Sequence, residues 1–131
     1  MKQCKVIKGG AAFRGKQGLD YFSGVSAQSA DSDGICMHMV VLPPGAKAKA
    51  HYHANHETAI YALEGATEMH WGLKLEHHIR LEAGDYLYIP AGVPHLPYNP
   101  TDKVAKAILA RTDPNEQESV VLVDIVPAQM T

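Results

Sequence analysis

The sequence predicts an all-β fold, either a barrel or a sandwich, for a chain of 131 residues. Short runs rich in Val, Ile, Tyr and Leu recur along it, and Gly, Pro and Asp residues separate one run from the next. The runs have the length of strands and are short for amphipathic helices. Many short strands at such spacing are typical of closed or two-layered β folds, so we expect this architecture.

The expected strands follow one another between turn-forming residues. The first five runs end before Pro43, Gly65, Gly72, Gly84 and Pro90, and they read ICMHMVVL, TAIYALE, TEMHW, HHIRLE and DYLYI. A sixth run, VAKAILAR at residues 104–111, has helical propensity, but its position between turn-like segments favours a closing strand. The run ESVVLVDIV at residues 118–126 extends the pattern, whereas the small, polar residues 23–34 predict a surface loop.

The composition argues against several classes of protein. With 46% hydrophobic and 20% charged residues the chain resembles ordinary globular proteins, and no apolar run is long enough to span a bilayer. A formal net charge of −2 offers no basic surface to nucleic acid. The first residues lack the apolar stretch of a secretory signal, so we expect a cytoplasmic protein with a single domain over residues 1–131.

Three histidines have the spacing of a metal site. His51 and His53 are two residues apart, and side chains two apart on a strand lie on the same face. Both imidazoles can therefore reach one ion. His95, on a later strand, is the natural third ligand. A facial set of three nitrogen ligands leaves coordination positions open for water or a substrate.

Two motifs of the chain match a known pattern residue by residue. Residues 84–99 read Gly, five residues, Pro, one residue, Gly, two residues, His95, three residues and Asn. Residues 45–65 begin with Gly, five residues, His51, one residue and His53, and they end in Gly65. With these motifs the chain resembles the cupin superfamily. The resemblance implies a double-stranded β-helix, a jelly-roll barrel, with both motifs in one cupin domain, and it implies a homodimer.

The first motif leaves two candidates for a fourth ligand, Glu57 and His56. Counted forward from His53, the Glu of the family falls on Glu57, but counted back from Gly65 it falls on Thr58. In an unbroken strand His56 and Thr58 face inward and Glu57 faces out, whereas one bulge before Glu57 would bring its carboxylate to the metal. Both alternatives stay open at the level of sequence.

These residues predict a metal-dependent enzyme that acts on a small polar or anionic organic molecule. The resemblance suggests oxidative cleavage, as in a dioxygenase, or decarboxylation, with one divalent transition metal (Fe, Mn, Ni, Cu or Zn) per chain. Because imidazole binds metal only when deprotonated, we expect metal occupancy to fall below about pH 6. Arg111 is a candidate for binding a substrate carboxylate, and a surface salt bridge is the alternative role for it. The alternative is a small-molecule binding or sensing module whose metal is structural or absent.

Overall fold

The computed structural model describes residues 1–116 and 119–127 and shows two antiparallel β-sheets in that part of the chain. The predicted all-β fold is therefore confirmed. The first sheet has the strand order β1 (Ala12–Arg14), β2 (Asp20–Val25), β3 (Cys36–Leu42), β10 (Ala105–Arg111), β5 (Thr58–Glu64) and β8 (Tyr86–Ile89). The second has the order β11 (Val120–Leu122), β4 (His51–His53), β9 (His95–Tyr98), β6 (Ala66–Trp71) and β7 (His77–Glu82).

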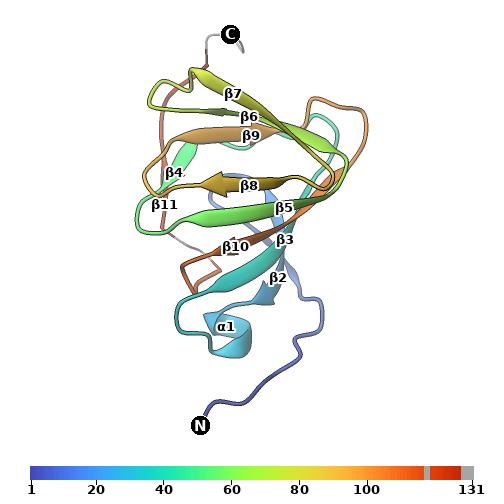
Figure 1. Cartoon of the computed structure of the whole chain (residues 1–131), viewed down its shortest axis with the longest axis vertical. Coiled ribbons are helices and arrows are strands. Elements are labelled where there is room, and N and C mark those ends of the chain that lie inside the picture. The colour runs from blue at the N-terminus through green and yellow to red at the C-terminus, as the bar shows by residue number, and fades with distance from the viewer. Residues whose placement is uncertain (117–118, 128–131) are drawn as a thin grey trace.

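Consecutive segments of the chain pass between the two sheets, so strands distant in sequence become neighbours (Figure 1). The predicted runs TAIYALE and HHIRLE are β5 and β7, residue for residue. The run at residues 104–111 is strand β10, which pairs with β3 on one side and β5 on the other. Of the last predicted run, the structure describes β11 as a strand, and residue 118 lies outside the described residues.

The prediction of a surface loop at residues 23–34 is wrong for its first half. Strand β2 continues to Val25, and a single helical turn, α1 (Ala27–Ala30), follows it. Ser26 caps this turn, because its hydroxyl accepts from the Ser29 amide while the Ser29 side chain bonds back to the Ser26 amide. Nothing in the described residues forms a helix long and apolar enough to cross a membrane.

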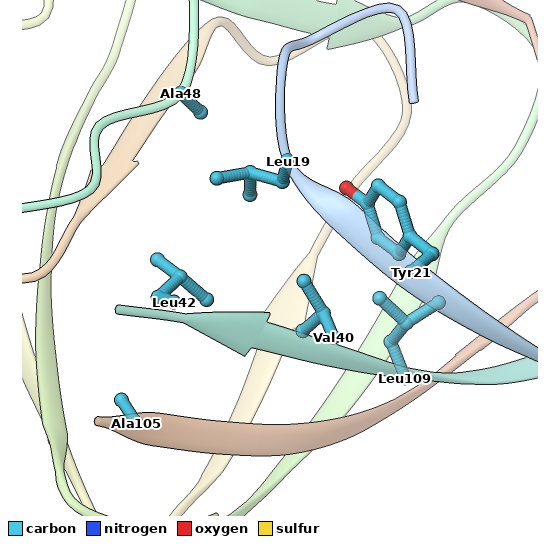
Figure 2. Close-up of a cluster of buried hydrophobic side chains, with 7 residues drawn as sticks. All are labelled: Leu19, Tyr21, Val40, Leu42, Ala48, Ala105 and Leu109. Atoms are coloured by element: carbon cyan, nitrogen blue, oxygen red, sulfur yellow. The ribbon is translucent and has the colours of Figure 1, made fainter. Parts of the chain in front are cut away.

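Alternation along the strands builds the core between the sheets. On β3 the residues Cys36, His38, Val40 and Leu42 are buried, and the residues between them are more exposed. Side chains of β2, β3 and β10 and of two flanking segments point toward one another there (Figure 2): Leu19, Tyr21, Val40, Leu42, Ala48, Ala105 and Leu109. Burying each of the larger side chains stabilises the fold by about 1.5–3 kcal/mol.

A second apolar cluster lies on the opposite face of the second sheet. Leu96 alternates with the inward-facing neighbours of β9 and packs with Ala50 and Leu75, and Val123 and Ile125 lie against them. The segment after β11 thus covers the outer face of β4 and β9. Both faces of these two strands are packed, which fixes the side chains that they carry.

Two loop residues, Gly65 and Asn99, hold strands of the two sheets together. Gly65 joins β5 to β6 with φ +72°, and a Cβ atom there would lie 2.6 Å from the Val104 carbonyl oxygen. The Asn99 amide donates to the carbonyls of Leu42 (2.9 Å) and Lys103 (2.7 Å), and its oxygen accepts from the Thr101 amide. The Asn99 side chain thus braces the loop after the second motif.

Candidate metal centre

Three buried histidines meet on the inner face of the second sheet. His51 and His53 lie on β4, and His95 lies on the neighbouring β9, directly opposite His51 in the strand register. One ring nitrogen from each lies within 4.8 Å of those of the other two. Each residue is 2% exposed. The alternation of β4 and the pairing of β4 with β9 therefore bring the three predicted ligands to one point.

Backbone carbonyls orient two of these rings. The Nδ1 atom of His51 lies 2.6 Å from the Lys49 carbonyl oxygen, and Nδ1 of His95 lies 3.0 Å from the Val93 carbonyl oxygen. A carbonyl only accepts, so each Nδ1 carries the proton and each Nε2 carries a lone pair. This is the arrangement by which proteins hold imidazole ligands toward a metal. The donor set fits a divalent transition metal.

The environment keeps the three imidazoles neutral. Burial, followed by the nearby His95, lowers the pKa of His51 to about 3. Burial likewise lowers the pKa of His95 to about 4, and it lowers the pKa of His53 further still. Neutral imidazole is the form that binds metal, so protons compete for these nitrogens only well below neutral pH. The expected fall of metal occupancy below about pH 6 rested on the ordinary imidazole pKa, and the lowered pKa values of the folded chain move it to lower pH.

His56 lies beside this group and is also buried, with 2% exposure. Its ring centre is 4.6 Å from that of His53. Its Nδ1 atom is 3.0 Å from the Ser119 hydroxyl and 3.7 Å from the Asp113 carboxylate, while Nε2 has no hydrogen-bond partner among the described residues. Burial, followed by the charge of Arg111, lowers the pKa of His56. Its ring is thus anchored through one nitrogen and leaves the other unused.

Glu57 lies on the other side of the same segment. Its side chain is exposed, and its carboxylate accepts a hydrogen bond of 2.9 Å from the Tyr88 hydroxyl. Thr58, the first residue of β5, is 2% exposed and faces inward. Residues 54–57 lie between β4 and β5 rather than in an unbroken strand, but burial alternates from residue 56 to residue 58, with His56 and Thr58 on the inner side. The three clustered imidazoles have His56 as their neighbour, and Glu57 points away from them.

A cavity between the sheets adjoins the three imidazoles. The water-accessible space in it is about 70 Å³, several times the ~15 Å³ that one water molecule needs. His51, His53 and His95 line it, whereas neither His56 nor Glu57 does. Much of the wall is apolar, and its members include Val40, Leu42, Ile60, Leu81, Ile89 and Leu109. A pocket of this kind accepts a small molecule of a few heavy atoms.

Arg111 brings a positive charge to this cavity. It is the last residue of β10, is 4% exposed, and pairs in register with Thr58. Its guanidinium carbon lies 5.4 Å from the centre of the Tyr21 ring. Its charge adds to the burial that lowers the pKa of His51, His53 and His95, so it lies close enough for its field to reach them.

Other histidines lie elsewhere. His38 and His70 are buried but do not line the cavity: the ring of His38 accepts a hydrogen bond from the Gly24 amide, and His70 stacks on Tyr98. His77 and His78 are both exposed. Sequence reasoning did not single out Gln17, a buried residue of the cavity wall in the turn before β2, for which the sequence carries no signal.

Comparison with known proteins agrees with this architecture. Solved structures of oxalate decarboxylases are similar to the chain. A variant of the Bacillus subtilis enzyme has a TM-score of 0.71 and 21% identity over 86% of this chain and 30% of that chain. The formate complex of the Lactobacillus farciminis enzyme has a TM-score of 0.70 and 18% identity over 89% of this chain and 33% of that chain.

These likenesses confirm the jelly-roll fold, and the chain spans about a third of the length of those decarboxylase chains. No curated protein sequence matches the chain. The family model described as the cupin domain matches residues 38–111, which is more than half of the chain. The match runs from within β3 to the end of β10 and includes all three clustered histidines. The chain therefore belongs to the cupin family.

Proposed function

We propose that this protein is a metal-dependent enzyme that acts on a small anionic organic molecule. The observation that carries the proposal is the buried group of three neutral imidazoles at the wall of a cavity that also holds the Arg111 guanidinium. His51, His53 and His95 would hold one divalent transition metal per chain. A bound divalent ion supplies a Lewis acid that polarises a carboxylate or carbonyl oxygen and lowers the pKa of bound water.

The residues around the cavity would perform the remaining tasks. The Arg111 guanidinium can grip a carboxylate through two parallel hydrogen bonds and so orient an anion. Apolar side chains such as Leu81 and Leu109 keep bulk water from the reacting molecule and strengthen every electrostatic interaction inside. The similarity to oxalate decarboxylases favours decarboxylation as the reaction. Oxidative cleavage is the second reaction that we propose for a metal-dependent enzyme of this kind.

We propose His56 as the fourth ligand in preference to Glu57. The buried position of His56 beside His53, its anchored Nδ1 and its unused Nε2 support this choice. An all-imidazole set favours Zn, Cu, Fe or Ni, whereas carboxylate ligands suit Mn. Mn(II) centres are known in the Bacillus subtilis oxalate decarboxylase. Metal preference would then distinguish this protein from that enzyme.

The variants His56→Ala and Glu57→Ala form a matched pair for the fourth ligand. We expect His56→Ala to weaken metal binding by at least about tenfold and Glu57→Ala to leave it within about twofold, because the Glu57 carboxylate is exposed. Competition titration with a chromogenic chelator measures both. A larger loss of metal affinity in Glu57→Ala than in His56→Ala would show that Glu57, and not His56, is the fourth ligand.

Metal analysis of the purified protein tests the proposal itself. We expect close to one transition metal ion per chain in the wild type and little in His51→Ala, with circular dichroism to check that the variant folds. Metal-free wild-type protein with unchanged turnover would refute the enzyme proposal. Stabilisation by a small carboxylate without any turnover would instead favour the alternative, a binding or sensing module.

We also propose that the chain forms a homodimer through the outer face of the first sheet. Large apolar side chains on that face are exposed: Met37 (48%), Leu63 (47%), Tyr86 (81%) and Tyr88 (61%). Exposed apolar side chains gathered on one face favour contact with another protein surface. Light scattering of the wild type and of Tyr86→Arg, which places a charge on the edge strand β8 of this face, would test it. A monomeric wild type would refute the proposal.

A further inference from the structure

We infer that Gln17 is a recognition residue of the cavity, whose Oε1 atom accepts a hydrogen bond from a hydroxyl or amine of the bound molecule. With Arg111 as the cationic partner, the ligand class is a small carboxylate that also carries a hydrogen-bond donor. The inference deepens the proposed function and rests on it for the identity of the site. Gln17 would give the cavity selectivity among anions that Arg111 alone would bind with similar affinity.

The first support is an unused polar atom. Gln17 is 1% exposed and lines the same cavity as the three clustered histidines. Its Oε1 atom is buried and has no hydrogen-bond partner among the described residues. A buried amide oxygen without a partner is unfavourable, because it has given up its hydrogen bonds to water. A donor on a molecule in the cavity would remove that cost, and an apolar molecule of the same shape would not.

Neighbouring residues fix the side chain of Gln17 in this orientation. Its Nε2 donates to the Tyr21 hydroxyl, so the oxygen is the end that stays without a partner among the described residues. Gly15 leaves room for the amide, because a Cβ atom there would lie 2.8 Å from Oε1 of Gln17 and 2.5 Å from the Tyr21 ring. A side chain held in this way is preorganised, which is the usual state of a recognition residue.

Backbone hydrogen bonds connect Gln17 to the metal centre. The Lys49 amide donates to the Gln17 carbonyl at 2.7 Å, and the Lys49 carbonyl accepts from Nδ1 of His51 at 2.6 Å. One residue, Lys49, therefore holds both the turn that carries Gln17 and the ring of a proposed ligand. This places the amide and the imidazoles in a fixed relation within one cavity.

Thr58 provides a second unused oxygen in the same wall. Its Oγ1 atom is buried without a hydrogen-bond partner among the described residues, and the residue lines the cavity opposite Arg111 in the strand register. A hydroxyl both donates and accepts, so Thr58 fits a carboxylate or a hydroxyl. Gln17 Oε1 only accepts, and for this reason it is the atom that demands a donor from the ligand.

Lactate and propionate are suitable probes, since they are three-carbon carboxylates that differ in one hydroxyl. Isothermal titration calorimetry of the metal-loaded protein would give both dissociation constants. We expect the wild type to prefer lactate by about tenfold or more. In Gln17→Met, which keeps the chain length and removes the acceptor, the preference should fall at least fivefold while the affinity for propionate stays within about twofold.

Two further variants keep the test decisive. Tyr21→Phe frees the amide of Gln17 to turn, so it should lose part of the preference even if Gln17→Met folds poorly. Met39→Leu, a conservative change on β3 outside the lining of the cavity, should keep it. A lactate preference that persists in Gln17→Met would come from the metal and would overturn the inference, as would equal affinities or no binding of either acid in the wild type.

The two proposals fail in different ways. A protein that takes up no transition metal refutes the metal-dependent enzyme, and the same titrations on that metal-free protein still test Gln17. A protein that binds metal but treats lactate and propionate alike keeps the metal centre and refutes the role of Gln17.

Discussion

In the metal-free protein, acid should destabilise the fold through the clustered histidines. The pKa of His51 falls to about 3 and that of His95 to about 4 on folding, from an ordinary value of 6.5. Burial is the first cause in both cases, and His53 is lowered in the same direction. Because the folded state holds these rings neutral, their full contribution to stability is present above pH 6.5 and is lost as the pH falls below it.

The size of the effect follows from proton uptake by the unfolded chain. At pH 5 each unfolded histidine is almost fully protonated, which favours unfolding by about 2 kcal/mol per residue. Three residues give about 6 kcal/mol, comparable to the ~5–15 kcal/mol that stabilises a typical domain. His38, His56 and His70 also have lowered pKa values, which adds to this effect.

Urea denaturation in the presence of a chelator at pH 7.5, 6.5, 5.5 and 5 would measure this loss. Below pH 6 the slope of the free energy of unfolding should be smaller in His51→Ala than in the wild type by about 1.4 kcal/mol per pH unit, which is one proton. Saturating Zn²⁺ should move the acid transition to lower pH. A free energy of unfolding that is equal at pH 7.5 and pH 5 in the metal-free protein would refute the reasoning.

Three further predictions concern the scaffold, each measured by urea denaturation at pH 7.5. Gly84→Ala should lower the free energy of unfolding by about 1–2 kcal/mol through its left-handed backbone alone. Gly65→Ala should lower it clearly more, because its Cβ would also meet the Val104 carbonyl oxygen at 2.6 Å. Equal losses would show that the contact relaxes. Asn99→Ala should cost about 2–4 kcal/mol, since two backbone carbonyls lose their donor, and a loss below 1 kcal/mol would contradict this. Leu109→Ala should cost about 2–5 kcal/mol with metal affinity unchanged, and a loss of metal affinity would argue against a rigid β4 and β9.

The sequence predicted the parts of the fold that depend on local pattern. Runs such as residues 58–64 carry strand propensity and end at glycines, so their bounds could be predicted from the chain alone. The helical turn after β2 was missed because its stability comes from the reciprocal bonds of Ser26 and Ser29, which a small, polar composition does not reveal. Strands β1 and β2, which pair with each other, were also missed, because the sequence near them is rich in glycine and shows little apolar alternation.

The same division holds for the candidate site. The two-residue spacing of His51 and His53 predicts a shared face whatever the surroundings, and a motif points to His95. Gln17 could not be found in this way, because it reaches the cavity only through the pairing of a distant turn with Lys49. The sequence did not decide the role of Arg111, because an arginine in a surface ion pair and one in a buried cavity have the same local pattern. The position of β10 between β3 and β5 decides it.

Strand register decides the proposed fourth ligand and, through it, the charge of the site. Thr58 pairs with Ile89 on one side and Arg111 on the other, and just before this strand His56 is buried on the inner side while Glu57 is exposed. A shift of one residue would exchange a neutral donor for a carboxylate. A divalent ion held by neutral imidazoles alone keeps both positive charges, and Arg111 adds a third nearby, so this register favours an anionic ligand more strongly than a site that contains Glu57.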